Sequence, residues 1–106
     1  MSAKDLGSLL KQAQEMQSKM ADVQRDLADK KVEVSTGGGM VKIVANGVNE
    51  IISVHIDDEL INMNDREVLE DLITGAINEV HRKVKELAQE EMTRFTGGIK
   101  IPGLFP

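Results

Sequence analysis

The sequence of 106 residues contains no cysteine, no tryptophan and no tyrosine, and only two phenylalanines and two prolines. Without cysteine the chain can form neither a disulfide framework nor a thiolate site, which fits a reducing cytoplasm. With so few aromatic rings it has little with which to stack the bases of a single-stranded nucleic acid. No apolar run approaches the length of a membrane span, and the first residues lack a hydrophobic signal core. We therefore expect one soluble, cytoplasmic domain without a membrane segment.

Most of the formal net charge of −5 resides in one block of the sequence. Residues 57–79 carry eight acidic groups and one basic group. Residues 1–31 carry six basic and five acidic groups, and residues 81–106 carry five basic and three acidic groups. The total alone argues against a polyanionic partner, but its uneven distribution leaves both ends of the chain mildly basic.

One stretch, residues 37–57, has the clear alternation of β-strands. Apolar residues alternate with mostly polar ones in residues 41–46 and again in residues 52–57, which predicts two strands with one buried face. That face is expected to carry Val41, Ile43, Ala45, Ile52, Val54 and Ile56. Residues 32–36 are rich in β-branched side chains and predict a further strand, joined to the next by a turn of three glycines, Gly37 to Gly39. The result is a three-stranded antiparallel meander.

The dipeptide Asn46-Gly47 predicts the hairpin between the second and third strands, because both residue types adopt positive φ at little cost. Ala45 can pair with Val48 or, around a longer loop, with Glu50. Both registers stay open, and because they have the same parity they put the same apolar side chains on one face.

Two long segments have the helical period of apolar residues. Residues 4–31 lack proline, and their apolar residues recur at spacings of three and four: Leu6, Leu9, Ala13, Met16, Met20, Val23 and Leu27. After an acidic connector at residues 57–65, a second helix should extend to about residue 95, with an apolar face of Leu69, Ile73, Ala76, Val80, Val84 and Leu87. Asn64 and Glu67 have the spacing of a capping box at its start, and Gly97-Gly98 should end it. Glu91 falls on the apolar face, which we interpret as the place where this helix enters solvent.

The predicted helices are longer than the predicted sheet. Each helix spans roughly 40 Å, whereas a seven-residue strand spans about 23 Å. Because a three-stranded sheet cannot cover both apolar stripes, we expect a tight homodimer to bury the remainder. The predicted fold is α+β, an α-β-β-β-α protomer with a three-stranded antiparallel meander and two long helices. We expect one domain over residues 1–98 and a flexible apolar tail over residues 99–106 that is apolar enough to dock somewhere.

Five short motifs lie along this order of helix, three strands and helix. They are Gly38-Gly39-Met40-Val41-Lys42, Asn46-Gly47, Val54-x-Ile56-Asp57, Asp65-x-x-x-Leu69-x-Asp71-Leu72-Ile73-x-x-Ala76 and Pro102-Gly103. Together they resemble the YbaB/EbfC family of bacterial nucleoid-associated proteins over almost the whole chain. The resemblance implies a tight dimer with protruding helices like tweezers. It also implies a DNA-binding protein of the bacterial cytoplasm that helps to organise the nucleoid, with a role in gene regulation as a further option.

No constellation of residues for chemistry stands out. The three glycines do not form a phosphate-binding loop, because a strand and not a helix follows them. His55 and His81 lack the spacing and the companions of metal ligands. No nucleophile with a base beside it can be assembled. We expect no enzyme activity, no cofactor and no metal site.

Basic residues are the remaining candidate site. The densest group is Arg82, Lys83 and Lys85, and the others are spread along the first helix. The candidates for contacts with double-stranded DNA are Lys4, Lys11, Lys19, Arg25, Lys30, Lys31, Arg82, Lys83 and Lys85. Taken singly each fits an ordinary solvated helix face, but a homodimer doubles the set, which can then contact phosphates while the acidic block faces away.

A second interpretation is a dimeric protein-interaction adaptor with incidental affinity for DNA and an unknown protein partner. The net negative charge favours this alternative, whereas the family resemblance favours a DNA-binding protein.

Overall fold

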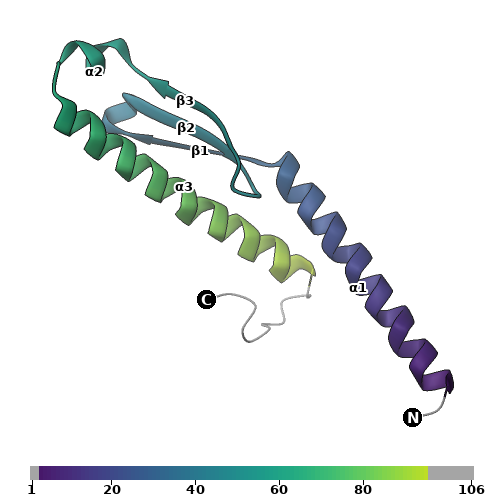
Figure 1. Ribbon diagram of the computed structural model, residues 1–106. Coiled ribbons are helices and arrows are strands. Elements are labelled where there is room, and N and C mark those ends of the chain that lie inside the picture. The colour runs from purple at the N-terminus through teal and green to yellow at the C-terminus, as the bar shows by residue number, and fades with distance from the viewer. Residues whose placement is uncertain (1–2, 96–106) are drawn as a thin grey trace.

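Three antiparallel strands form a sheet, and a long helix lies across one of its faces (Figure 1). The structure, a computed structural model, describes residues 3–95. Its elements are α1 (Ala3–Asp29), β1 (Lys31–Thr36), a 3-10 turn (Gly37–Gly39), β2 (Val41–Asn46), β3 (Ile51–Ile56), α2 (Asp58–Asn62) and α3 (Arg66–Phe95). The predicted α+β fold is confirmed. The predicted helix stop at Gly97-Gly98 and the predicted tail at residues 99–106 lie outside the described residues.

The main core lies between the sheet and the N-terminal two thirds of α3. The helical period turns Ala76, Val80 and Val84 toward the sheet, where they are buried together with Val41 and Ile43 of β2. α3 packs mainly against β1 and β2, so it covers the first and the middle strand of the sheet. It does not cover β3, the third strand.

The acidic connector contains a short helix, α2, that the sequence did not predict. The side chain of Asp57 caps it, since its Oδ1 accepts a hydrogen bond from the backbone N–H of Glu59 at 2.9 Å. Leu60 of this helix is buried in the main core. α2 therefore closes the end of the core that α3 and the sheet leave open.

Asp65 and not Asn64 caps α3. The Oδ1 atom of Asp65 accepts a hydrogen bond from the backbone N–H of Val68 at 3.2 Å. Asn64 has a φ of 53°, in the left-handed region, and precedes the cap. The predicted capping box of Asn64 with Glu67 is therefore wrong by one residue, because Asn64 is used to turn the chain from α2 into α3.

β2 and β3 pair in a register that neither predicted alternative contains. Ile43 lies opposite Val54, and beyond a β-bulge Ala45 lies opposite Ile51. The parity is as predicted, so Ile43 and Val54 share a face. The predicted burial of the third strand is wrong within the protomer: because α3 covers mainly β1 and β2, Ile52 and Val54 remain 50% and 52% exposed.

The turn after β2 depends on Asn46 and Gly47, though not through a positive φ at Gly47. Asn46 Oδ1 accepts a hydrogen bond from the backbone N–H of Glu50 at 2.9 Å, and the positive φ of this turn, 67°, belongs to Asn49. The N–H of Gly47 donates to the carbonyl oxygen of Leu27 at 2.8 Å. A Cβ atom at position 47 would lie 2.4 Å from that oxygen, so glycine allows the end of α1 to approach the turn.

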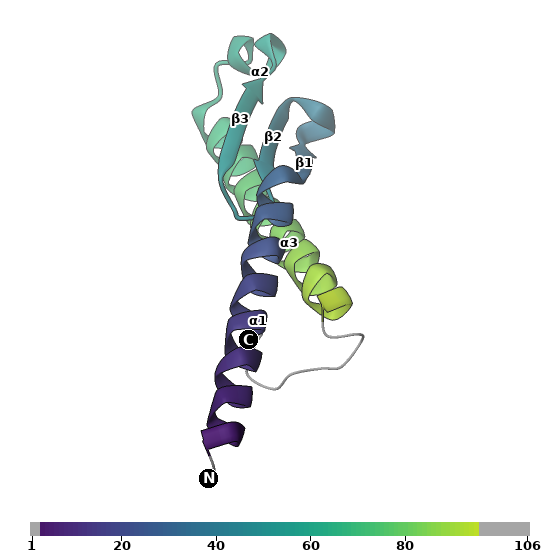
Figure 2. The ribbon, with the colours of Figure 1, turned by 90° about the vertical axis from the view of Figure 1, so that its right-hand side faces the viewer.

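α3 continues beyond the sheet and packs against α1, and the two helices run in opposite directions (Figures 1 and 2). Val23 and Leu27 of α1 form a second buried cluster with Met92 of α3. Nearer its N-terminus α1 has no covering element within residues 3–95, and its apolar side chains there are exposed. The predicted projection of both helices beyond the sheet is confirmed, and it gives the molecule extents of 72 × 23 × 19 Å.

Gly47→Ala should destabilise the fold, whereas the same substitution at Gly7 should stabilise it. An alanine Cβ at position 47 overlaps the Leu27 carbonyl, and we expect a loss of about 1–3 kcal/mol in the free energy of unfolding. Gly7 lies inside α1 with open space around it, and we expect a gain of about 0.5–1 kcal/mol. Urea denaturation of both variants measures these values. Equal effects at the two positions would contradict the close approach as the role of Gly47.

Candidate nucleic-acid interface

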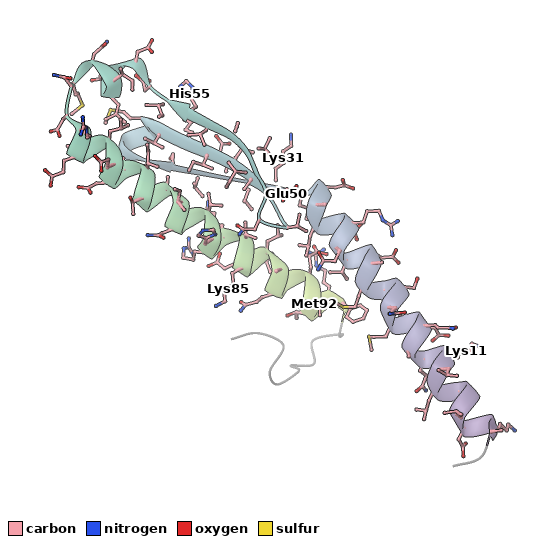
Figure 3. All side chains as sticks on the ribbon, in the orientation of Figure 1. Lys11, Lys31, Glu50, His55, Lys85 and Met92 are labelled. Carbon is pink, nitrogen blue, oxygen red and sulfur yellow. The ribbon has the colours of Figure 1, made fainter. Side chains whose placement is uncertain are left out.

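The nine predicted basic residues lie along the whole molecule and do not form one patch. Four are on α1, Lys30 and Lys31 lie at the junction of α1 and β1, and three are on α3. Figure 3 shows Lys31 beside the sheet, Lys85 on the opposite, outer side of α3, and Lys11 on the part of α1 that projects into solvent. One protomer therefore does not bring these three lysines to a common surface.

Arg82 is exposed but is flanked by two carboxylates of its own helix. It forms ion pairs with Glu79 and Glu86, three residues before it and four residues after it on α3. Its hydrogen bond with Glu79 is the main cause that lowers the pKa of the Glu79 carboxyl and raises the pKa of the Arg82 guanidinium. Because part of its charge is already compensated, Arg82 is a weaker candidate for a phosphate contact than its position in the basic cluster suggests.

Two other candidates also have partners within the protomer. Arg25 pairs with Asp22 on the exposed side of α1. Lys83 Nζ donates a hydrogen bond to the backbone carbonyl oxygen of Glu33 on β1 at 3.3 Å. This contact ties the middle of α3 to the edge of the sheet, and it brings the Arg82–Lys85 segment close to the beginning of β1.

Lys30 joins α1 to α3. Its ammonium group pairs with the carboxylate of Glu91, whose side chain is only 8% exposed, and Arg94 Nη2 lies 2.9 Å from Oε1 of the same carboxylate. The hydrogen bond from Lys30 is the main cause that holds the pKa of Glu91 below its ordinary value. The interpretation of Glu91 as the start of the solvated part of α3 is wrong, because this carboxylate is buried between two cations beside the second cluster.

The other basic candidates have more accessible charges. Lys19 Nζ lies 6.0 Å from the ring centroid of Phe95, a weak cation–π contact. Four lysines of the predicted set are exposed and have neither an ion pair nor a cation–π contact within residues 3–95: Lys4, Lys11, Lys31 and Lys85. Their ammonium groups can meet phosphates without first breaking a contact inside the protein.

Lys42 is an exposed cation outside the predicted set. It lies on β2 and, together with Lys83, lines a shallow groove along β1 that also contains Glu33 and Glu79. Its outward position in the alternating strand is the signal that identifies it in the sequence. Because carboxylates alternate with the cations in this groove, it offers a mixed surface and not a purely basic one.

The acidic residues gather at one end of the molecule. α2 and the first turns of α3, which carry most of the charges of residues 57–71, lie at the end opposite the N-terminus of α1 (Figures 1 and 2). Most of these carboxylate side chains are exposed. A ligand with negative charge is therefore repelled mainly from this end.

Neither a metal site nor a membrane segment is found in the part of the chain that the structure describes. Within residues 3–95 no three His, Asp or Glu side chains come together as metal ligands. In the same range no helix combines the length and the apolar character needed to cross a bilayer.

Over residues 2–99 the sequence matches the profile of the YbaB/EbfC DNA-binding family. The chain belongs to this family. A nucleoid-associated protein of Desulfotalea psychrophila is 46% identical over 100 residues, 94% of this chain and 94% of the relative. Another, from Ruminiclostridium cellulolyticum, is 47% identical over 102 residues, 95% of this chain and 89% of the relative. The resemblance inferred from the sequence motifs is confirmed.

The fold of this YbaB/EbfC protein is also found among solved structures. A crystal structure of an uncharacterised protein from Helicobacter pylori is similar to it with a TM-score of 0.74 at 26% identity. The similarity covers 91% of this chain and 98% of that chain.

The ion pairs of Glu91 should make the stability of this YbaB/EbfC protein depend on pH. Because folding lowers the pKa of Glu91, the contribution is complete above the ordinary value of 4.5 and is lost as the pH falls below it. We expect Glu91→Gln to lower the free energy of unfolding near neutral pH, and the difference from the wild type to shrink in acid. Urea denaturation at a series of pH values measures it.

Glu90→Gln is the matched control, since Glu90 is the exposed neighbour of Glu91 on α3. It should leave the stability nearly unchanged at every pH. A deficit of Glu91→Gln that stays the same from neutral to acidic pH would contradict the proposed ion-pair contribution.

Proposed function

We propose that this protein binds duplex DNA as a homodimer, through phosphate contacts from basic helix residues, and contributes to nucleoid organisation and to gene regulation. Its family membership and the names of its nucleoid-associated relatives support this function. The proposed location is the nucleoid, in the cytoplasm. Neither catalysis nor a cofactor is part of the proposal.

The observation that carries this proposal is a group of exposed lysines from the predicted set that have neither an ion pair nor a cation–π contact among residues 3–95: Lys4, Lys11, Lys31 and Lys85. Lysine contacts with phosphates release counterions, and that release supplies affinity without regard to base sequence. The five other candidates from the sequence, Lys19, Arg25, Lys30, Arg82 and Lys83, are secondary because each already has a partner. Recognition of DNA shape fits such a set better than the reading of base edges.

The proposed homodimer is supported by the apolar side chains at the uncovered edge of the sheet. Ile51, Ile52 and Val54 of the edge strand β3 are each about half exposed. An edge strand with apolar side chains and free backbone groups is a surface that proteins normally cover. We propose that a second copy of the chain covers β3, which doubles the number of basic residues available to one DNA duplex.

Val54→Asp should weaken the homodimer by at least about tenfold, because the new carboxylate would be buried without a partner in the interface. Sedimentation equilibrium measures the association constant, and circular dichroism checks that the fold is retained. Ile77→Asp is the matched control, since Ile77 is an exposed apolar residue of α3. An unchanged association constant for Val54→Asp would remove β3 from the proposed interface.

DNA affinity should fall steeply as salt rises from about 50 to 200 mM, with a slope of log affinity against log salt close to −0.9 for each phosphate contact. Lys85→Ala should make this slope shallower by up to about two units in a homodimer, and Arg82→Ala by less. Fluorescence anisotropy of a labelled duplex measures the slope. Arg66→Ala is the charge-matched control, since Arg66 lies at the acidic end of α3 and should leave the slope unchanged.

The second candidate function is a dimeric protein-interaction adaptor with incidental DNA affinity, which the net charge of −5 favours. The same salt series separates the two candidates. If no binding occurs even at low salt, DNA is not the ligand, and the adaptor becomes the better account.

A further inference from the structure

The apolar stripe of α1 is covered along only half of its length. Val23 and Leu27 are buried against α3. Toward the N-terminus the stripe continues without interruption, but there Leu6, Leu9 and Met16 are 54%, 48% and 54% exposed. We refer to the exposed part, with the members Leu6, Leu9, Leu10, Ala13 and Met16, as the distal stripe. A contiguous apolar surface of this kind normally has an occupant.

The cover stops where α3 ends. Phe95, the last described residue, packs with Met20 against the cluster of Val23 and Met92, and its ring also faces Lys19. Met20 lies one helical turn from Met16, the member of the distal stripe nearest to the second cluster. The C-terminal end of α3 therefore lies beside this end of the stripe. At this point α3 points along α1 toward the N-terminus of α1 (Figures 1 and 2). Whatever follows Phe95 therefore starts next to the uncovered surface.

The residues that follow have the composition and the length to cover it. Residues 99–105 contain four large apolar side chains, Ile99, Ile101, Leu104 and Phe105, and one charge, Lys100. Fully extended, seven residues span about 23 Å. The distal stripe from Leu6 to Met16 spans about 15 Å of helix. Residues 96–98, with their two glycines, are long enough to lead from Phe95 onto the stripe.

We propose that residues 99–105 dock in extended form on the distal stripe of α1 of the same chain. We call residues 99–105 the strap. The second cluster already joins α1 to α3, so the strap would extend an existing contact within one chain. Its tether holds it beside the stripe at a high effective concentration, which favours it over the α1 helix of another molecule. The apolar side chains face Leu6, Leu9 and Met16, and Lys100 faces solvent. The covered stripe is then unavailable for association of the protein beyond the homodimer.

Disulfide trapping tests the proposal cleanly, because the natural chain has no cysteine. The double variant Leu9→Cys with Leu104→Cys should form a disulfide within one chain at least about tenfold faster than Lys11→Cys with Leu104→Cys. The control position lies roughly 160° round the helix from Leu9. Non-reducing gels and peptide mass spectrometry give the rates and show whether a bond joins one chain or two.

Each outcome of the disulfide experiment either supports or overturns the proposed docking. Fast formation within one chain, only in the Leu9 variant, supports the strap. A disulfide between position 9 of one chain and position 104 of another overturns docking in the same chain. Equal rates in the two double variants overturn docking on the stripe.

Hydrogen exchange tests the same contact without introduced cysteines. Leu104→Ser should speed the exchange of backbone amides in residues 6–16 by at least about threefold, because an uncovered helix frays more readily. Lys100→Ser is the matched control and should leave that exchange unchanged. Identical exchange in the two variants would overturn the proposal.

Discussion

The arrangement of the elements depends on a difference in length between the long helices and the sheet. The strands have six residues each and are about 20 Å long, whereas α3 has 30 residues and extends for about 45 Å. The sheet is too short to cover the whole of α3, and its core contacts end near Val84, so the C-terminal part of the apolar face of α3 needs another partner. The C-terminal half of α1 provides it, with Val23 and Leu27 against Met92. α1 in turn extends past the end of α3, which leaves its own N-terminal half exposed.

Contacts at the junction of α1 with the sheet fix the direction of α1 relative to the rest of the molecule. The N–H of Gly47 donates to the carbonyl oxygens of both Leu27 and Lys30, at 2.8 and 3.1 Å, so the turn after β2 is hydrogen-bonded directly to the end of α1 and to the residue that follows it. On the other side of the junction, Lys30 and Arg94 compensate the buried carboxylate of Glu91. A buried charge without such partners would be strongly unfavourable. The direction of α1 therefore depends on one close backbone contact and one ion-pair cluster.

Much of this architecture is predictable from periodicity, and what is not predictable involves long-range contacts or very short elements. The 3.6-residue and 2-residue periods correctly identified both long helices, all three strands and the face shared by Ile43 and Val54. The five-residue helix α2 is too short to show a period. Burial of Val54 could not be judged from β3 itself, because it depends on how far α3 reaches across the sheet.

The basic residues show the same division between local and long-range information. The partners of Arg82 lie three and four residues away on the same helix, so its ion pairs can be read from the sequence. The partner of Lys30 lies 61 residues away, and nothing local distinguishes this lysine from Lys31, which is exposed and unpaired within residues 3–95. Composition can therefore count the cations, but only the fold shows which of them are accessible.

The fold also separates most of the acidic residues of this chain from the exposed lysines of the predicted set. Asp71, near the acidic end of α3, lies 14 residues before Lys85, which corresponds to about 21 Å along the helix. The Debye length at about 0.1 M salt is about 10 Å, so a phosphate at Lys85 is largely screened from that carboxylate. The lysines on the projecting part of α1 are farther still from the acidic end. For the proposed DNA ligand, the separation of charges along this elongated molecule therefore matters more than the sign of the net charge.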